Sequence, residues 1–283
     1  MSFFQVQNSI NCRGKLVDLS IPKVMGIINL TPDSFYEKSR QYGKEHIINR
    51  VDEIVSQGVD IIDIGAYSSR PGADNITEDE EWKRLQPALN AIRSKYQEVL
   101  ISVDTFRSRI AQKCIEEYNV NLINDISGGE LDKDMFSVVG KLQVPYILMH
   151  MQGTPQNMQD NPQYKHIIQE MLSYFANKKE QLLQAGVKDV IIDPGFGFGK
   201  TLDHNYEILH RLNEFQIFEN PLLVGISRKS MIYKYFDNTA EDALNGTTVL
   251  NTLALTKGAK FLRVHDVKEA VEAVMLFTKV QTQ

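Results

Sequence analysis

Val190-Ile191-Ile192-Asp193-Pro194-Gly195-Phe196-Gly197-Phe198-Gly199-Lys200-Thr201 shows most clearly how this chain is built. An apolar run of strand type ends at Asp193, and the proline and glycines that follow prevent a regular helix or strand from continuing. We therefore expect a buried strand that delivers Asp193 to a loop. The glycines do not form a nucleotide-binding motif, because Pro194 stands where a Walker loop needs glycine and Lys200 where the dinucleotide pattern needs it.

This pattern of a short apolar run followed by polar residues recurs along the chain. Strands are predicted at 24–28, 61–64, 100–103, 121–124, 146–149, 190–192, 222–225 and 261–264. Helices are predicted at 44–56, 78–96, 108–118, 132–141, 163–185, 202–212, 240–257 and 267–278. Eight alternations of strand and helix are typical of a (β/α)8 barrel, the TIM barrel of the α/β class, rather than of an open sheet. We predict one domain over residues 1–283, with a hairpin within 1–20 that closes the bottom of the barrel.

The composition is that of an ordinary globular protein. Of the 283 residues, 42% are hydrophobic and 24% charged, and 31 Lys and Arg against 36 Asp and Glu give a net charge of -5. This balance argues against a general nucleic-acid or acidic-membrane binder. Cys12 and Cys114 lie far apart with no zinc-type spacing, and no apolar run has the length of a signal peptide or membrane span. We expect a cytoplasmic protein that acts on small molecules, with no nucleic-acid or membrane partner.

Polar residues follow the predicted strands, where a barrel of this type carries its active site. Asp104, Asn124 and Asp193 follow strands three, four and six and are expected to converge. A carboxylate offers two acceptors that match adjacent N–H donors, and an amide offers a donor and an acceptor, so the three together suggest a nitrogen heterocycle as ligand. Asp63 and Asp125 also end strands, but we interpret them as structural.

Positive charge gathers after the last two strands. Arg228 and Lys229 follow strand seven, and Arg263 and His265 end strand eight, where this fold commonly binds phosphate. These groups predict an anionic group on the substrate. Asn29 follows strand one, which is the neighbour of strand eight in a closed barrel, and it could share Mg²⁺ with the same phosphate.

Two segments with proline and small polar residues suit loops that close over a substrate. They are Thr31-Pro32-Asp33-Ser34-Phe35 after strand one and Ser68-Ser69-Arg70-Pro71-Gly72 after strand two. The sequence suggests no covalent nucleophile with a partner base. Positioning of substrates and stabilisation of a leaving group therefore fit better than a covalent intermediate.

These residues resemble the dihydropteroate synthase family, from about residue 22 to about residue 267. The matching blocks are Val24-Met25-Gly26-Ile27-Ile28-Asn29-Leu30-Thr31-Pro32-Asp33-Ser34-Phe35, Asp63-Ile64-Gly65 with Ser68-Ser69-Arg70-Pro71-Gly72-Ala73, Ser102-Val103-Asp104-Thr105, Asn124-Asp125-Ile126-Ser127-Gly128-Gly129, Met149-His150, Asp193-Pro194-Gly195 with Gly197-Phe198-Gly199-Lys200, Gly225-Ile226-Ser227-Arg228-Lys229-Ser230 and Arg263-Val264-His265-Asp266. Several blocks that match in order are far more specific than one motif.

The resemblance implies a transferase that joins a dihydropterin carrying a CH₂-diphosphate to p-aminobenzoate, with Mg²⁺ and as a homodimer. It places Asp104, Asn124, Met149, Asp193, Lys229 and Arg263 at the pterin, with Lys229, Arg263, Asp104 and Asp193 as the catalytic set. It places Asn29, Arg263 and His265 at the diphosphate, with Asn29 also at the metal. It assigns the p-aminobenzoate site to Thr31, Pro32, Asp33, Ser34, Phe35, Ser69, Arg70, Pro71, Phe198 and Ser230.

The chain departs from the commoner family pattern in its two loops. Gly65-Ala66-Tyr67 stands where Gly-Gly-Glu is frequent, Ser69 replaces a frequent threonine, and the first loop continues Tyr36-Glu37-Lys38-Ser39-Arg40. These differences leave the p-aminobenzoate contacts and sulfonamide sensitivity open. Two other kinds of protein use the same barrel. One is a methyltetrahydrofolate-dependent methyltransferase, which has no use for a diphosphate site. The other is a non-catalytic pterin-binding protein, which would be expected to lose the cationic cluster.

Overall fold

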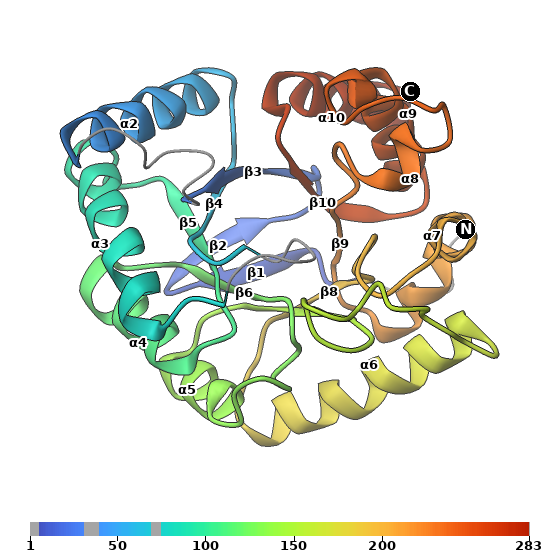
Figure 1. Cartoon of the computed structure of the whole chain (residues 1–283), viewed down its shortest axis with the longest axis horizontal. Coiled ribbons are helices and arrows are strands. Elements are labelled where there is room, and N and C mark those ends of the chain that lie inside the picture. The colour runs from blue at the N-terminus through green and yellow to red at the C-terminus, as the bar shows by residue number, and fades with distance from the viewer. Residues whose placement is uncertain (1–5, 31–39, 69–74, 283) are drawn as a thin grey trace.

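Eight parallel strands form a closed barrel at the centre of the molecule. The computed structural model describes residues 6–30, 40–68 and 75–282. The strands are β3 (Lys23–Asn29), β4 (Ile61–Gly65), β5 (Leu100–Asp104), β6 (Leu122–Asp125), β7 (Tyr146–Met149), β8 (Val190–Asp193), β9 (Leu222–Val224) and β10 (Ala259–Val264). Each pairs with the next in parallel, and β10 closes the ring by pairing with both β9 and β3 (Figure 1). The predicted (β/α)8 barrel is thus confirmed.

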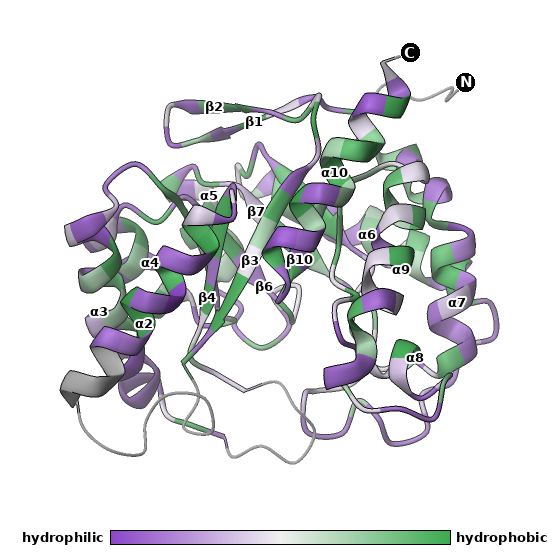
Figure 2. Cartoon of the chain, turned by 90° about the horizontal axis from the view of Figure 1, so that it is seen from above, coloured by the Kyte–Doolittle hydropathy of each residue, from purple (hydrophilic) through white to green (hydrophobic). Residues whose placement is uncertain are grey.

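A hairpin covers one end of this barrel. Strand β1 (Ser9–Cys12) pairs antiparallel with β2 (Lys15–Asp18), and the pair lies across the end at which the barrel strands begin (Figure 2). Its inner side chains join one apolar cluster with residues near the start of all eight barrel strands. The members are Ile10, Cys12, Val17, Leu19, Met25, Ile61, Leu100, Leu122, Ile147, Ile191, Leu223 and Phe261. The hairpin therefore excludes water from the bottom of the barrel.

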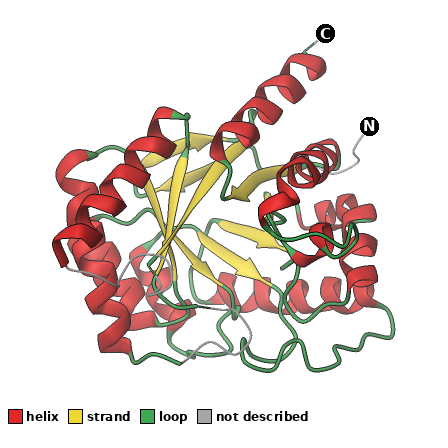
Figure 3. Cartoon of the chain, turned by 45° about the horizontal axis from the view of Figure 1, so that its top comes forward, coloured by secondary structure: helices red, strands yellow, loops and turns green. Residues whose placement is uncertain are grey.

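Helices surround the strands and cover their outer faces (Figure 3). The outer layer contains α2 (Arg40–Ser56), α3 (Glu78–Lys95), α4 (Ser108–Tyr118), α5 (Met135–Leu142), α6 (Ile167–Gln184), α7 (Leu202–His210), α9 (Leu244–Thr256) and α10 (Val267–Gln281), with the short elements η1 (Leu212–Phe218), α8 (Ser230–Tyr233) and η2 (Glu241–Ala243). Apolar side chains from outer strand faces and helices form the larger core cluster. None of the helices in the described ranges combines the length and apolar character needed to cross a membrane.

Helix boundaries differ from the prediction where side chains bind loop backbone. Helix α6 begins at Ile167 rather than at 163, and Tyr164, which precedes it, donates its hydroxyl to the carbonyl of Gly199 at 2.8 Å. Helix α5 begins at Met135 rather than at 132, and the carboxylate of Asp132, which precedes it, accepts from the N–H of Ser108 at 2.7 Å. These changes leave the strand ends, and so the site, in place.

Candidate active site

Side chains alternate between the two faces of each strand, and this alternation places the predicted polar residues inside the barrel. They lie at the end where the barrel strands finish, which we call the mouth. Side chains two residues apart on a strand share a face. A residue two or four positions after a member of the apolar cluster under the hairpin, which we call the inner cluster, therefore also points into the barrel. Asp63 is two residues after Ile61 and pairs in register with Ser102, Asp104 pairs with Asn124, and Met149 pairs with Asp193. The inward set at this end is Asn29, Asp63, Asp104, Asn124, Met149, Asp193 and Arg263. Six of these seven are residues that the sequence predicts for the site.

Arg263 joins two carboxylates within the mouth. Its Nε donates to Oδ2 of Asp63 at 2.6 Å, and its Nη2 donates to Oδ2 of Asp104 at 2.7 Å. The Asp63 side chain is fully buried and also accepts from Nδ2 of Asn124 at 3.2 Å. One half of the mouth is therefore a connected network of two carboxylates, one amide and one guanidinium.

Asp193 and Lys229 form the other half. The Oδ1 atom of Asp193 accepts from the N–H of Gly195 at 2.7 Å, which fixes the carboxylate at the start of its loop. The Lys229 ammonium donates to the carbonyl of Phe196 and lies 4.6 Å from the centre of the Phe198 ring. Phe198 is half-buried, so this face of the mouth combines a cation with an aromatic wall.

Burial and neighbouring charges perturb the pKa of these groups. Burial raises the pKa of Asp104 to about 7, against the opposing effect of Arg263. Burial lowers the pKa of Lys229 to about 8, although Asp193 favours its charged form. Burial also disfavours the Arg263 cation, but Asp63 and Asp104 outweigh it, and the pKa of Arg263 rises above its ordinary value. Several titratable groups with shifted pKa values in one cluster are typical of an active site.

His265 lies beside this set as a neutral donor or acceptor. Burial, followed by the charge of Arg263, lowers the pKa of His265 to about 4. Its Nδ1 lies 3.3 Å from Oγ of Ser227, which also accepts from the His265 N–H at 3.1 Å. Arg228, by contrast, forms two hydrogen bonds to Asp266, at 2.9 and 2.7 Å. The charge of Arg228 is thus already paired within the protein, whereas the sequence predicts that it contributes to a site for an anionic substrate group.

Lys200 supports the loop after β8 and was not assigned a role from the sequence. Its ammonium is buried and donates to the carbonyls of His150, Gly195 and Phe198 at 3.0, 3.0 and 2.9 Å. These contacts tie the loop after β7 to the loop that carries Phe198. The adjacent glycines in the sequence indicate a tight loop, but not the lysine that holds it.

Several predicted p-aminobenzoate residues fall outside the described residues. They are Thr31, Pro32, Asp33, Ser34, Phe35, Ser69, Arg70 and Pro71. Ser230 is described, and it begins the short helix α8 directly after Lys229. Phe198 and Ser230 therefore mark the described part of this predicted subsite.

Asn29 is the candidate for an Mg²⁺ contact. Within the described ranges, no group of three or more His, Cys, Asp or Glu side chains could hold a metal ion. Mg²⁺ usually takes few protein ligands together with substrate phosphate oxygens, and it prefers oxygen donors. The carboxamide oxygen of Asn29, at the end of β3 and in register with Gly65, fits that mode of binding.

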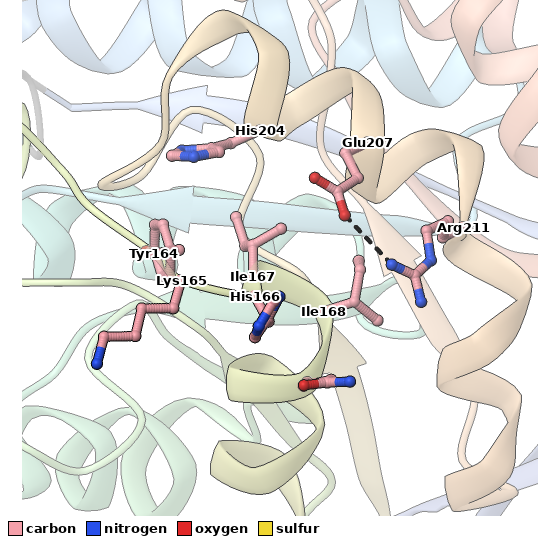
Figure 4. Close-up of a pocket in the computed structure, with 9 residues that line it drawn as sticks. Tyr164, Lys165, His166, Ile167, Ile168, His204, Glu207 and Arg211 are labelled. Carbon is pink, nitrogen blue, oxygen red and sulfur yellow. Dashed lines mark hydrogen bonds and ion pairs between the residues drawn. The ribbon is translucent and has the colours of Figure 1, made fainter.

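A separate hollow of about 240 Å³ lies between the start of α6 and α7. It is lined by Tyr164, Lys165, His166, Ile167, Ile168, Gln169, His204, Glu207 and Arg211 (Figure 4). Glu207 and Arg211 point toward one another and form an ion pair at 3.2 Å. No predicted site residue lines this hollow, so it belongs to the helical layer rather than to the mouth.

Comparison with known proteins gives one consistent result. The pterin binding enzyme family matches residues 25–265. A dihydropteroate synthase of Haemophilus influenzae is 40% identical over 255 residues, 89% of this chain and 92% of that protein. The Yersinia pestis dihydropteroate synthase solved with a sulfonamide drug has a TM-score of 0.90 and 36% identity, covering 97% of this chain and 100% of that one. The Xanthomonas albilineans enzyme solved with 4-aminobenzoic acid has a TM-score of 0.89 and 31% identity, covering 98% and 99% of the two chains.

Proposed function

Because this chain belongs to the dihydropteroate synthase family of pterin-binding enzymes, we propose that it joins 6-hydroxymethyl-7,8-dihydropterin diphosphate to p-aminobenzoate. The products are 7,8-dihydropteroate and diphosphate. The observation that carries this proposal is the inward layer at the barrel mouth, where Asp104, Asn124 and Asp193 lie with the cations Arg263 and Lys229. Such a layer matches a ring rich in N–H groups that bears an anionic substituent.

Asp104, Asn124 and Asp193 hold the pterin ring in this proposal. The carboxylates accept hydrogen bonds from adjacent ring N–H groups, and the amide oxygen of Asn124 accepts one more. Met149, which is buried and in register with Asp193, packs against the ring. Lys229 donates to a ring acceptor beside Asp193. The ring is thereby fixed with its methylene toward Arg263.

Arg263, His265 and Asn29 bind the diphosphate. The guanidinium of Arg263 lies against the ring and stabilises the negative charge that grows on the departing oxygen. His265 stays neutral at physiological pH, because its pKa is lowered to about 4, and so it donates one hydrogen bond without adding charge. Asn29, together with phosphate oxygens, would hold Mg²⁺, and the ion would neutralise part of the diphosphate charge.

The reaction breaks one bond and forms one bond. The bond between the methylene carbon and the diphosphate oxygen breaks, and both its electrons leave with diphosphate. The amine nitrogen of p-aminobenzoate then attacks the methylene carbon and afterwards loses one proton to solvent. Phe198 and Ser230, together with the loop residues that the resemblance assigns, shape the p-aminobenzoate site. The protein supplies position and electrostatic stabilisation rather than a nucleophile.

A cytoplasmic homodimer is the second part of the proposal. Helices α9 and α10 pack side by side and leave apolar side chains exposed, including Leu276 and Val280, which are 70% and 71% exposed. A second copy of the chain is the occupant that the family's homodimers suggest for this face. Both cysteines are free and buried, which suits a reducing compartment. Light scattering with Leu276→Glu tests the dimer, because this change is expected to give monomers.

The decisive experiment measures diphosphate release and dihydropteroate formation by the purified protein with Mg²⁺, each substrate alone and both together. Product that requires both substrates supports the proposal. Tight binding of the pterin without product would instead identify a pterin-binding protein. Methyl transfer from methyltetrahydrofolate, without use of the diphosphate substrate, would identify the methyltransferase alternative.

A further inference from the structure

Two fully buried aspartates, one on β4 and one on β6, point in opposite directions. Asp63 on β4 points into the barrel, two residues after Ile61 of the inner cluster. Asp125 on β6 points out of the barrel, because it pairs in register with Leu148, a member of the larger core cluster between strands and helices. The outward Asp125 is fully satisfied by local donors, including the Tyr146 hydroxyl at 2.6 Å. It is a structural group.

Asp63 instead connects two residues of the substrate site through one oxygen atom. Its Oδ2 accepts from Nε of Arg263 at 2.6 Å and from Nδ2 of Asn124 at 3.2 Å. Its Oδ1 has no hydrogen-bond partner among the residues that the structure describes. A buried ion pair of this kind contributes little to the stability of the fold, because its replacement by apolar side chains is often neutral or stabilising.

The bond to Asp63 determines how Asn124 faces its ligand. A carboxamide carries its donors on one atom and its acceptor on the other. Because Nδ2 is turned toward Asp63, Oδ1 is turned away from it. Asn124 therefore presents an acceptor to the mouth, and the ligand atom opposite it must be a donor.

The Asp63 carboxylate also sets the orientation of the Arg263 guanidinium. Asp63 holds Nε and Asp104 holds Nη2, whereas neither carboxylate engages Nη1. The side chain is only 18% exposed, so these two anchors leave it little freedom. The two hydrogens of Nη1 and the second hydrogen of Nη2 are then the donors that remain for an anionic group on the substrate.

We propose that Asp63 is a positioning residue that fixes the amide of Asn124 as an acceptor and aims the guanidinium of Arg263 at the leaving group. This inference deepens the proposed function and rests on it for the identity of the ligand. It identifies the ring that the site prefers as one with an N–H donor opposite Asn124. A ring with a carbonyl oxygen at that point is rejected.

The first test compares Asp63→Asn with the matched control Asp125→Asn in direct binding of 6-hydroxymethyl-7,8-dihydropterin diphosphate, without p-aminobenzoate. Asp63→Asn is expected to weaken binding roughly 10- to 100-fold, because it misplaces both contacts. Asp125→Asn is expected to lower the melting temperature but to keep wild-type affinity. Equal affinities for wild type and Asp63→Asn would overturn the proposal. Turnover is not needed for this readout, so a wild type that binds the pterin but makes no product would refute the proposed function alone.

In this proposal the 2-amino group of the pterin is the donor that faces Asn124. A second test therefore uses a 2,4-dioxo analogue, in which an oxygen acceptor replaces that 2-amino group. The wild type is expected to discriminate strongly against it, and Asp63→Asn to reduce this discrimination by about tenfold, because the freed amide of Asn124 can turn. A merely structural role for Asp63 would weaken both ligands equally, which contradicts the proposal.

If Asp63→Asn does not fold, a neutron structure of the wild type with the bound pterin provides the test. Hydrogen atoms on Asn124 that face Asp63 support the proposal. Hydrogen atoms that face the ligand would overturn it.

Discussion

The two ends of the barrel are built from the same strands with the same inward alternation, yet they do opposite things. At the hairpin end, the inner layer is wholly apolar and is sealed by Ile10 and Leu19, which are fully buried. At the mouth, two to four residues further along each strand, the inner layer carries Asp63, Asp193 and Arg263. Burial of apolar area stabilises the fold, whereas burial of charge opposes it.

This difference divides stability from chemistry within one barrel. The pKa of Asp104 is raised and that of Lys229 is lowered, mainly because burial disfavours both charged forms. The hairpin end supplies apolar burial that offsets this effect. Changes at the mouth should therefore alter turnover with little loss of stability, and changes at the hairpin should do the reverse.

The largest effect is expected for Lys229→Met, which removes the cation at the mouth but keeps most of its packing. Turnover of dihydropteroate should fall about 10²- to 10³-fold, the usual result of losing one preorganised electrostatic group. The melting temperature should change little, because removal of a buried charge offsets the loss of its interaction with Asp193. Full turnover in this variant, or in Asp193→Ala, would contradict the assigned site.

The next effect concerns the hairpin. Leu19→Ala should lower the free energy of unfolding by about 2–5 kcal/mol, because it leaves a cavity under the barrel. Turnover per folded molecule should not change. Urea denaturation followed by fluorescence measures the first quantity, with Leu16→Ala as control, since Leu16 is 71% exposed in the same hairpin. A large loss of turnover in Leu19→Ala would show that the two ends are not separate.

The pH dependence of kcat/KM sharpens the account of the mouth. Activity should fall as pH drops below about 7, because Asp104 gains a proton and no longer accepts two hydrogen bonds. It should also fall above about 8, because Lys229 loses its charge. Lys229→Arg should move only the basic limb, to higher pH, since arginine stays charged. A basic limb that does not move in this variant would assign it to another group.

The smallest effect compares one glycine from each end. Gly14 and Gly197 both have positive φ, 88° and 79°, so alanine strains either position. An added Cβ would meet nothing within 4 Å at Gly14, but at Gly197 it would lie 3.2 Å from Cδ of Lys229. Each variant should lose about 1 kcal/mol of stability, and only Gly197→Ala should also raise KM for the pterin. The same KM in both variants would contradict the contact with Lys229.

Much of the fold could be predicted from the sequence, because each strand is a short apolar run next to a helical pattern. All eight strands lie where they are predicted, although their ends shift by up to two residues. The predicted helix 240–257 is divided into η2 and α9, and η1 and α8 were not predicted. Such short turns depend on tertiary contacts, for example the Tyr206 hydroxyl that donates to the carbonyl of Met231 at 2.8 Å.

The direction in which a site residue points is harder to predict from the sequence where its strand is apolar on both faces. Residues 61, 62 and 64 are all isoleucine, so alternation does not reveal which way Asp63 points. Only the closed barrel and its register show that Asp63 faces inward and Asp125 outward. Asp104, Asn124 and Asp193 are easier to identify, because each lies at a strand end next to loop residues.

A crystal structure of the protein with 6-hydroxymethyl-7,8-dihydropterin diphosphate tests the division between the two ends most directly. We predict that the ring N–H groups lie against Asp104, Asn124 and Asp193, with the diphosphate against Arg263 and His265. A ligand bound outside this inward-facing layer, or held without contact to Asp193 and Arg263, would contradict the assignment of the mouth as the active site.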